Sequence, residues 1–277
     1  MSLDAAVKNT LAYSLFFDFP LAPHEVHYWL NSPHVVNFSQ LPLKDIPPLS
    51  QKQIQSRAKR LQTSLLKKKL ATSLLKPLFP LPFIWFIGLT GSVAVNNATP
   101  NDDLDIFIIT APSTLWLVRP LCLLYFSFKG VRRSRRTPNN KVTNLICPNL
   151  WLDYNNLQLL PHQRSLYTAH EVLQVFPLIN KNYTYERFIF QNSWTKKYLA
   201  NAYSVSVTQR SIRHSGLDPE SIKNKYPFYY LLAPLNLLFF LFQFLIMFPH
   251  KKKEKVSLGK AFFHNSDFPQ KVLESLS

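Results

Sequence analysis

Three carboxylates stand within four residues of the sequence, at Asp102, Asp103 and Asp105, directly before an apolar run. If this run is an extended strand, alternate side chains share a face, so Asp103 and Asp105 project together and Asp102 points the other way. Two carboxylates about 7 Å apart on one strand face repel each other unless a cation neutralises them. The pair is therefore a candidate ligand set for Mg²⁺ or Mn²⁺. An Asp-x-Asp pattern alone is also typical of a turn.

A turn of small residues lies upstream of the acids. The run "FIWFIGL" (83–89) is aromatic and β-branched, which predicts a buried strand, and Thr90-Gly91-Ser92 follows it as a turn or short helix. Ten residues separate Ser92 from Asp103, where "DLDIFIIT" predicts the next strand. A turn of small residues leaves backbone N–H groups open to a bound anion.

This combination resembles the signature of the DNA polymerase β superfamily of nucleotidyltransferases. In that family hydrophobic-Gly-Ser is followed, after a similar spacer, by Asp-hydrophobic-Asp-hydrophobic, and Gly91, Ser92, Asp103 and Asp105 occupy these positions. The resemblance implies an α+β fold with a nucleotidyltransferase core of a short mixed sheet and helices. It also implies Mg²⁺-dependent transfer of a nucleotide from an NTP such as ATP, with pyrophosphate released and the terminal phosphates bound at Gly91 and Ser92. The acceptor, whether RNA, a protein hydroxyl or a small molecule, is left open.

The superfamily normally adds a third acid from a neighbouring strand. The segment "KVTNLICPNLWLDYNN" predicts that strand, and Asp153 is its only acid. We therefore expect the carboxylates of Asp103, Asp105 and Asp153 to converge on a catalytic metal site. Asp153 could instead serve the turn into "YNN". Asn149 could then take the third position, which would favour a non-catalytic nucleotide- or RNA-binding module.

The balance of charge favours an anionic partner. The chain has 277 residues and carries 32 Lys and Arg against 15 Asp and Glu, a formal net charge of +17. The densest basic cluster lies between a predicted helix and a predicted strand, and it could contact RNA or another anionic acceptor or be solvated. Its members are Arg132, Arg133, Arg135 and Arg136. The same two alternatives, phosphate contact or a solvated face, apply to Lys67, Lys68 and Lys69 on a predicted helix over 51–75.

Other candidate residues have simpler explanations. Cys122 and Cys147 show neither paired metal-ligand spacing nor a disulfide framework, which excludes a zinc site of the usual pattern and fits a reducing cytoplasm. The first residues lack the basic start of a signal peptide, so we expect a cytoplasmic protein. His170 and Glu171 fit a helix, where we expect them at the surface or at a cap. Arg119 could reach the site, although anchoring its own helix is the simpler role.

Four regions follow from these patterns. We expect an N-terminal helical, winged-helix-like segment at 1–50, the core at 51–200, an exposed loop insertion at 201–226 and a C-terminal helical region at 227–277. The winged-helix character comes from similarity to uncharacterised bacterial proteins in "LAYSLFFDFPLAPHEVHYWL". The loop assignment comes from the broken apolar pattern around "HSGLDPES".

The segment 228–248 has no charged residue and precedes Lys251, Lys252 and Lys253, as a membrane span would. Asn236 and Gln243 lie seven residues apart and so share one face of a helix. We expect a core helix whose polar stripe faces solvent or a polar partner and whose other faces pack on the sheet. Membrane contact through 228–248, as in a membrane-associated accessory protein, is the alternative.

Overall fold

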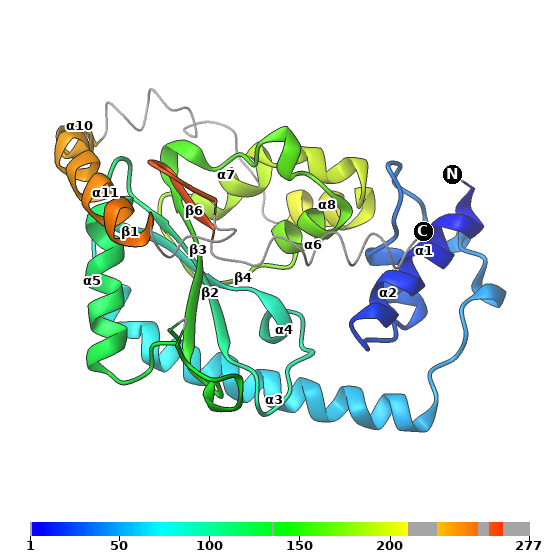
Figure 1. Ribbon diagram of the computed structural model, residues 1–277. Helices are drawn as coiled ribbons and strands as arrows, with labels where there is room; N and C mark the ends of the chain where they lie inside the picture. The colour runs from blue at the N-terminus through cyan, green and yellow to red at the C-terminus, as the bar shows by residue number, and fades with distance from the viewer. Residues whose placement is uncertain (1, 135, 210–225, 249–254, 263–277) are drawn as a thin grey trace.

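A six-stranded mixed sheet forms the centre of an α+β fold (Figure 1). The computed structural model describes residues 2–134, 136–209, 226–248 and 255–262. The strands are β1 (Ile84–Leu89), β2 (Leu104–Thr110), β3 (Ile146–Asp153), β4 (Phe176–Asn180), β5 (Lys255–Ser257) and β6 (Lys260–Phe262). The helices are α1 (Leu3–Phe16), α2 (Pro23–Tyr28), α3 (Gln51–Leu75), α4 (Gly91–Ala94), α5 (Leu115–Phe128), α6 (Leu166–Leu173), α7 (Thr184–Gln191), α8 (Ala200–Gln209), α10 (Pro227–Leu231) and α11 (Ala233–Met247).

The strand order is β4-β1-β2-β3-β6-β5. Only the pairing of β2 with β3 is parallel among the described strands. A parallel pair requires a crossover connection, and α5 provides it. The strands β1 and β2 are buried almost throughout, which explains their near-continuous apolar sequences. At the far edge, β6 pairs with β3 and the hairpin partner β5 ends the sheet.

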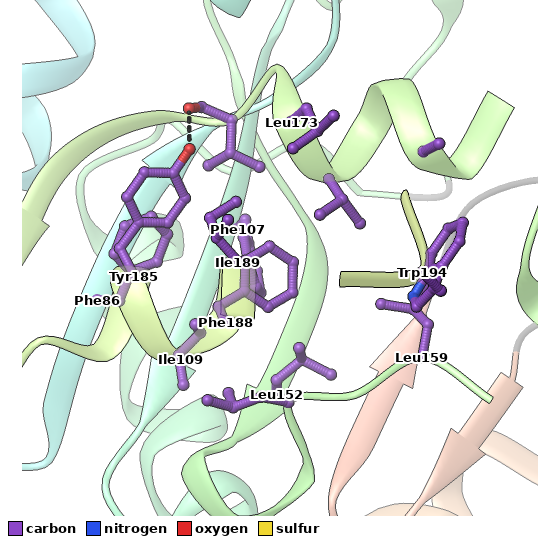
Figure 2. Close-up of a cluster of buried hydrophobic side chains, with 14 of the residues drawn as sticks. Phe86, Phe107, Ile109, Leu152, Leu159, Leu173, Tyr185, Phe188, Ile189 and Trp194 are labelled. Carbon is purple, nitrogen blue, oxygen red and sulfur yellow. Dashed lines mark hydrogen bonds between the residues drawn. The ribbon is translucent and has the colours of Figure 1, made fainter. Parts of the chain in front are cut away.

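Helices cover both faces of the sheet. On one face, α6, α7 and α8 pack on Phe86, Phe107 and Leu152, and Figure 2 shows how the rings of Tyr185 and Phe188 fill this layer. On the other face, α3 and α5 pack on the remaining side chains of β1 and β2. Because strand residues alternate between the two cores, Asp105 shares its face with Phe107, on the side of α6 and α7.

The N-terminal segment is helical and has a core of its own. Side chains from α1, α2 and the following loop bury one another, among them Val7, Val26 and Leu30. The described residues of this segment contribute no strand to the sheet and make only an isolated bridge, between Ser32 and Leu199. The described residues of 2–50 thus form helices and loops, and they contain no β-wing.

Two of the other expected regions differ from the structure. Residues 201–209 are not an exposed loop, because they continue α8 and bury Ala202 and Ser206. The rest of that expected insertion, 210–225, lies outside the described residues. The C-terminal region is not wholly helical, because it returns to the sheet as the β5–β6 hairpin. Only three residues form each of these strands, too short a pattern to stand out in sequence.

The apolar helix α11 packs with its polar stripe turned inward. Asn236 and Gln243 are buried against α5, whereas most of the large apolar side chains of α11 are exposed. This corrects the expectation that its apolar faces pack on the sheet, although the stripe does face a polar partner. Among the described residues, no helix has both the length and the apolar character that crossing a bilayer requires.

Candidate active site

The loop after β1 touches the first residues of β2. The N–H of Thr90 donates to the carbonyl of Asp105 at 3.0 Å, which ends the β1–β2 pairing at this point. Gly91 then adopts a φ of +63°, and a Cβ atom there would lie 2.7 Å from Oδ2 of Asp105. Only glycine fits this position without a shift, because it tolerates the left-handed backbone and leaves room for the carboxylate. The backbone of the expected phosphate loop therefore lies against a carboxylate of the expected metal pair.

The structure brings together Asp103, Asp105 and Cys147. The possible ligand atoms of these three side chains all lie within 4.8 Å of one another, so the group could hold a metal ion. The parallel register places Asp105 directly opposite Cys147, which explains the third member. Burial, and then the charge of Asp103 and of Glu171, raise the pKa of Asp105. A cation would relieve this cost.

Cys147 joins the site although its spacing in the sequence gives no signal. Burial, followed by the charges of Asp105 and Asp103, raises the pKa of its thiol, so the group stays protonated near neutral pH. A protonated thiol is a poor ligand, and Mg²⁺ and Mn²⁺ prefer carboxylate oxygens. The donor set thus suits a hard cation held by Asp103 and Asp105, with Cys147 beside it.

Two polar partners already contact the acids. Arg133 forms an ion pair with Asp103, and the side-chain amide of Asn149 donates to Asp105. Asn149 therefore occupies the place on β3 that faces the acidic pair. Of the other members of the arginine cluster, Arg132 and Arg136 are exposed and Arg135 lies outside the described residues.

Asp153 lies at the other end of β3. In the parallel register it is opposite Thr110, whereas Cys147 is opposite Asp105. Its buried carboxylate accepts the N–H groups of Thr114, at 3.3 Å, and Asn155, at 3.0 Å. The expected convergence of Asp153 with the acidic pair is wrong, because five residues of strand separate it from Cys147. Its surroundings are those of a turn residue that caps local backbone.

Asp102 and Ser92 brace the loop instead of facing the metal pair. The Ser92 hydroxyl donates to Asp102 at 2.5 Å, and the N–H and hydroxyl of Thr99 donate to the same carboxylate at 3.1 and 2.5 Å. Burial alone would raise the pKa of Asp102, but these hydrogen bonds outweigh it and lower the pKa. The side chain of Ser92 is thus engaged, and only its backbone is left for a phosphate.

Two of the three consecutive lysines of α3, at 67–69, hold loops. The buried ammonium of Lys67 donates to the carbonyls of Pro100 and Asp102 and to the side chain of Asn144, at 2.6–3.0 Å. Lys68 donates to the carbonyl of Ala94 and the side chain of Asn96, at 3.2 and 2.7 Å. Lys69 is exposed. Lys67 is therefore a structural residue that holds these loops, and not a phosphate contact.

A cleft of about 780 Å³ opens beside the acidic group. One wall is the core, with Gly91, Ser92 and Asp105, and the opposite wall is the N-terminal segment. Aromatic side chains of that segment line the cleft, among them Tyr13, Phe17, Phe19 and Trp29. The helix α6 supplies the third wall with Tyr167, His170 and Glu171. The volume is in the range of small-molecule sites.

Arg60 joins the two walls of the cleft. Its guanidinium donates to the carbonyl of Asp18, at 2.9 Å, and to the side chain of Asn97, at 2.6 Å. The amide of Asn97 in turn donates to the carbonyl of Phe17 at 2.9 Å. The end of α1, the helix α3 and the loop after α4 are therefore linked at one side of the cleft.

Glu171, like Cys147, is a site residue that the sequence did not reveal. It is partly buried in the cleft, burial raises its pKa to about 7, and its charge contributes to the raised pKa of Asp105. Tyr167, His170, Glu171 and Gln174 are spaced as one face of a helix, and all four line the cleft. That spacing was the available signal, although it does not say what the face contacts.

His170 is a packing residue and not a surface or capping one. Its ring stacks on Tyr13 with a centroid distance of 4.0 Å and lies 5.1 Å from the ring of Trp29. Burial lowers its pKa to about 3, so the ring is neutral at physiological pH. Arg119 likewise anchors its helix, because it donates to Gln243 at 2.9 Å, far from the cleft.

Comparison of the chain with protein-family models, with curated proteins and with solved structures finds no match.

Proposed function

We propose that the cleft binds an NTP and transfers its nucleotidyl group to an acceptor hydroxyl. The observation that carries this proposal is the close approach of Gly91 to Asp105, because it places the backbone of the loop after β1 against a carboxylate of the acidic pair. Phosphates bound by the N–H groups of Gly91 and Ser92 would then lie beside Asp103 and Asp105. Both acids would hold a divalent ion, Mg²⁺ or Mn²⁺, which when bound neutralises phosphate charge.

The remaining roles follow from the other walls of the cleft. The aromatic side chains of Tyr13, Phe17 and Trp29 suit stacking against a nucleoside base. In the reaction the acceptor oxygen forms a bond to the α-phosphorus, the α–β phosphoanhydride bond breaks, and pyrophosphate leaves. The acceptor proton passes to Glu171, whose pKa of about 7 suits a general base near neutral pH. Arg133, paired with Asp103, orients that carboxylate.

A second function has support from one contact. Asn149 donates an amide hydrogen to Asp105 at a position where the superfamily pattern would place an acid. This arrangement fits a module that binds a nucleotide, or the phosphates of RNA, without transferring it. The two functions differ in whether Glu171 matters, because a proton acceptor is needed only for transfer.

The test is a transfer assay on the full-length chain with each α-labelled NTP, Mg²⁺, total RNA and cell lysate. We expect label in a product and release of pyrophosphate, with the rate lowered about 10²–10⁴-fold by Glu171→Gln. Asp105→Asn should abolish both transfer and metal-dependent binding. Glu186→Gln is the matched control, since Glu186 bonds Asn180 at the surface of α7.

Two results would contradict the proposal. If calorimetry gives the same NTP affinity with and without Mg²⁺, the metal has no part in NTP binding at this site. Mg²⁺-dependent NTP binding without pyrophosphate release, and with no effect of Glu171→Gln, would select the non-catalytic module.

A further inference from the structure

The helices α10 and α11 expose an apolar surface in place of the polar surface expected of a helix that faces water. No charged residue occurs from 227 to 248, and the two polar side chains within α11, Asn236 and Gln243, are buried. The exposed large side chains of these helices are Phe228, Leu231, Leu235, Leu237, Leu238, Phe239, Leu241, Phe242, Leu245, Ile246 and Phe248. A helix on the surface of a protein in water normally has the opposite arrangement.

Hydrogen bonds fix this inverted orientation. Asn236 accepts the N–H of Trp116 at 2.8 Å, and Gln243 donates to the carbonyl of Trp116 at 2.7 Å. Turning α11 about its axis would break both contacts and leave buried backbone groups without partners. The neighbouring helix α5 exposes Leu121, Leu124 and Phe128 as well. The apolar surface is therefore a fixed property of the fold, and contiguous patches of this kind mark interaction sites.

The charges around this surface indicate its occupant. Lys129 and Arg132, at the end of α5, and Lys255, at the start of β5, are exposed. In the sequence, Lys251, Lys252 and Lys253 follow α11 closely, and the whole chain carries a net charge of +17. Two copies of the chain joined through this face would bring these positive charges together. A bilayer with anionic head groups would attract them, at about 1 kcal/mol for each basic residue near the surface.

The dimensions indicate how the helices would lie. With 15 residues α11 is about 22 Å long, whereas the hydrocarbon core of a bilayer is about 30 Å thick. Its inward stripe is bonded to α5, so the helix presents one side and not its whole circumference. In Figure 1, α5, α10 and α11 lie on the side of the molecule opposite α1 and α2, which line the cleft. We propose that this apolar face docks α10 and α11 flat on an anionic membrane surface, with the cleft left open to water.

The test is flotation of the full-length protein with lipid vesicles. We expect the chain to float with vesicles that contain phosphatidylglycerol and to bind far less to vesicles of phosphatidylcholine alone. The double variant Leu238→Glu/Leu245→Glu should bind the anionic vesicles at least about tenfold more weakly, because it places two negative charges on the apolar face. Both side chains are exposed, so we expect the variant to fold. The matched control is Leu65→Glu/Leu66→Glu, which adds the same charge at exposed leucines of α3.

Near-ultraviolet circular dichroism and thermal unfolding show whether the variants are folded. Equal flotation of the wild type with phosphatidylcholine alone would overturn the anionic surface as the occupant. No flotation with either vesicle would overturn membrane docking altogether. A dimer in light scattering that the Leu238→Glu/Leu245→Glu variant dissociates, together with no flotation, would assign the face to a second copy of the chain.

Discussion

Gly91 sets how closely the loop after β1 approaches Asp105. Its φ of +63° favours glycine, and a methyl group there would lie 2.7 Å from a carboxylate oxygen of Asp105. Gly130, after α5, has a similar φ of +67°, but no other side chain or backbone among the described residues lies within 4 Å of its Cβ position, its chain neighbours apart. An alanine would meet similar backbone strain at either position, but only at position 91 would it also meet Asp105.

We predict that Gly91→Ala weakens Mg²⁺-dependent NTP binding by about tenfold or more, because the loop must move away from the acidic pair. Gly130→Ala should cost about 1 kcal/mol of stability and leave binding unchanged. Calorimetric titration with ATP and thermal unfolding measure the two effects. Equal loss of binding in both variants would show that strain, and not contact with Asp105, is responsible.

The sequence predicts individual residues of the site only where the pattern is local. Gly91, Ser92, Asp103 and Asp105 belong to one short motif; the structure places Gly91 against Asp105 and groups Asp103 with Asp105, whereas the side chain of Ser92 bonds Asp102. Asp153 is expected at the site as the only acid of the predicted strand, but its place depends on the register of β3 against β2, which no local pattern specifies. Glu171 reaches the cleft only because α6 packs on the same sheet face as Asp105.

At the scale of elements, α5 and α11 complete each other. Pro120 lies inside α5 and has no N–H, so the carbonyl of Trp116 lacks its usual partner within the helix. Gln243 supplies that partner at 2.7 Å, and its own carbonyl accepts from Arg119. The side chain of Gln243 thus replaces the hydrogen bond that Pro120 removes from α5.

We predict that Gln243→Ala lowers the free energy of unfolding by about 1–3 kcal/mol, because it leaves the buried carbonyl of Trp116 without a donor. In a Pro120→Ala background the helix can supply its own N–H, so the same substitution should cost about 1 kcal/mol less. Urea denaturation of the four proteins in this cycle gives the coupling, with Leu238→Ala as an exposed control on α11. An identical cost of Gln243→Ala in both backgrounds would mean that Pro120 is not the cause.

Elements with long local patterns were the most predictable. The expected helix over 51–75 agrees with α3 at both ends, and the runs at 83–89 and 103–110 agree with β1 and β2 within one residue. The orientation of α11 was not predictable, because the spacing of Asn236 and Gln243 shows a polar stripe without saying which way it faces. Their partners are backbone groups of α5, which carry no sequence signal.

For the molecule as a whole, buried ionisable groups set the dependence of stability on pH. Burial raises the pKa of Asp153 and of Glu171 to about 7, so both bind protons more tightly when folded than when unfolded. Their contribution is therefore present at acidic pH and is lost as pH rises through about 7. Burial lowers the pKa of His170 to about 3, so its contribution is lost as pH falls below about 6.5. The two effects oppose each other in acid. Above pH 6.5 only the decline in stability from the carboxyl groups remains, and Asp105, whose pKa is also raised, adds to that decline.

We predict that the free energy of unfolding falls by about 1–2 kcal/mol between pH 6.5 and 8 through Asp153 and Glu171. The double variant Asp153→Asn/Glu171→Gln should lose this part of the decline, whatever its absolute stability. Urea denaturation across this pH range measures the slope, and Glu186→Gln serves as the control. A decline as steep in the double variant as in the wild type would assign it to other groups.

The pairing of β3 with β6 affects the order in which the chain can fold during synthesis. The helices α6, α7, α8, α10 and α11 are all made between these two strands, so one edge of β3 stays unpaired while they emerge from the ribosome. Bare strand edges readily pair with other chains, and the nascent protein meanwhile also displays the apolar side of α11. The short β5–β6 hairpin is made after all the other described elements, and it pairs with that edge of β3. Its pairing is therefore the folding step that protects this edge of the sheet from aggregation.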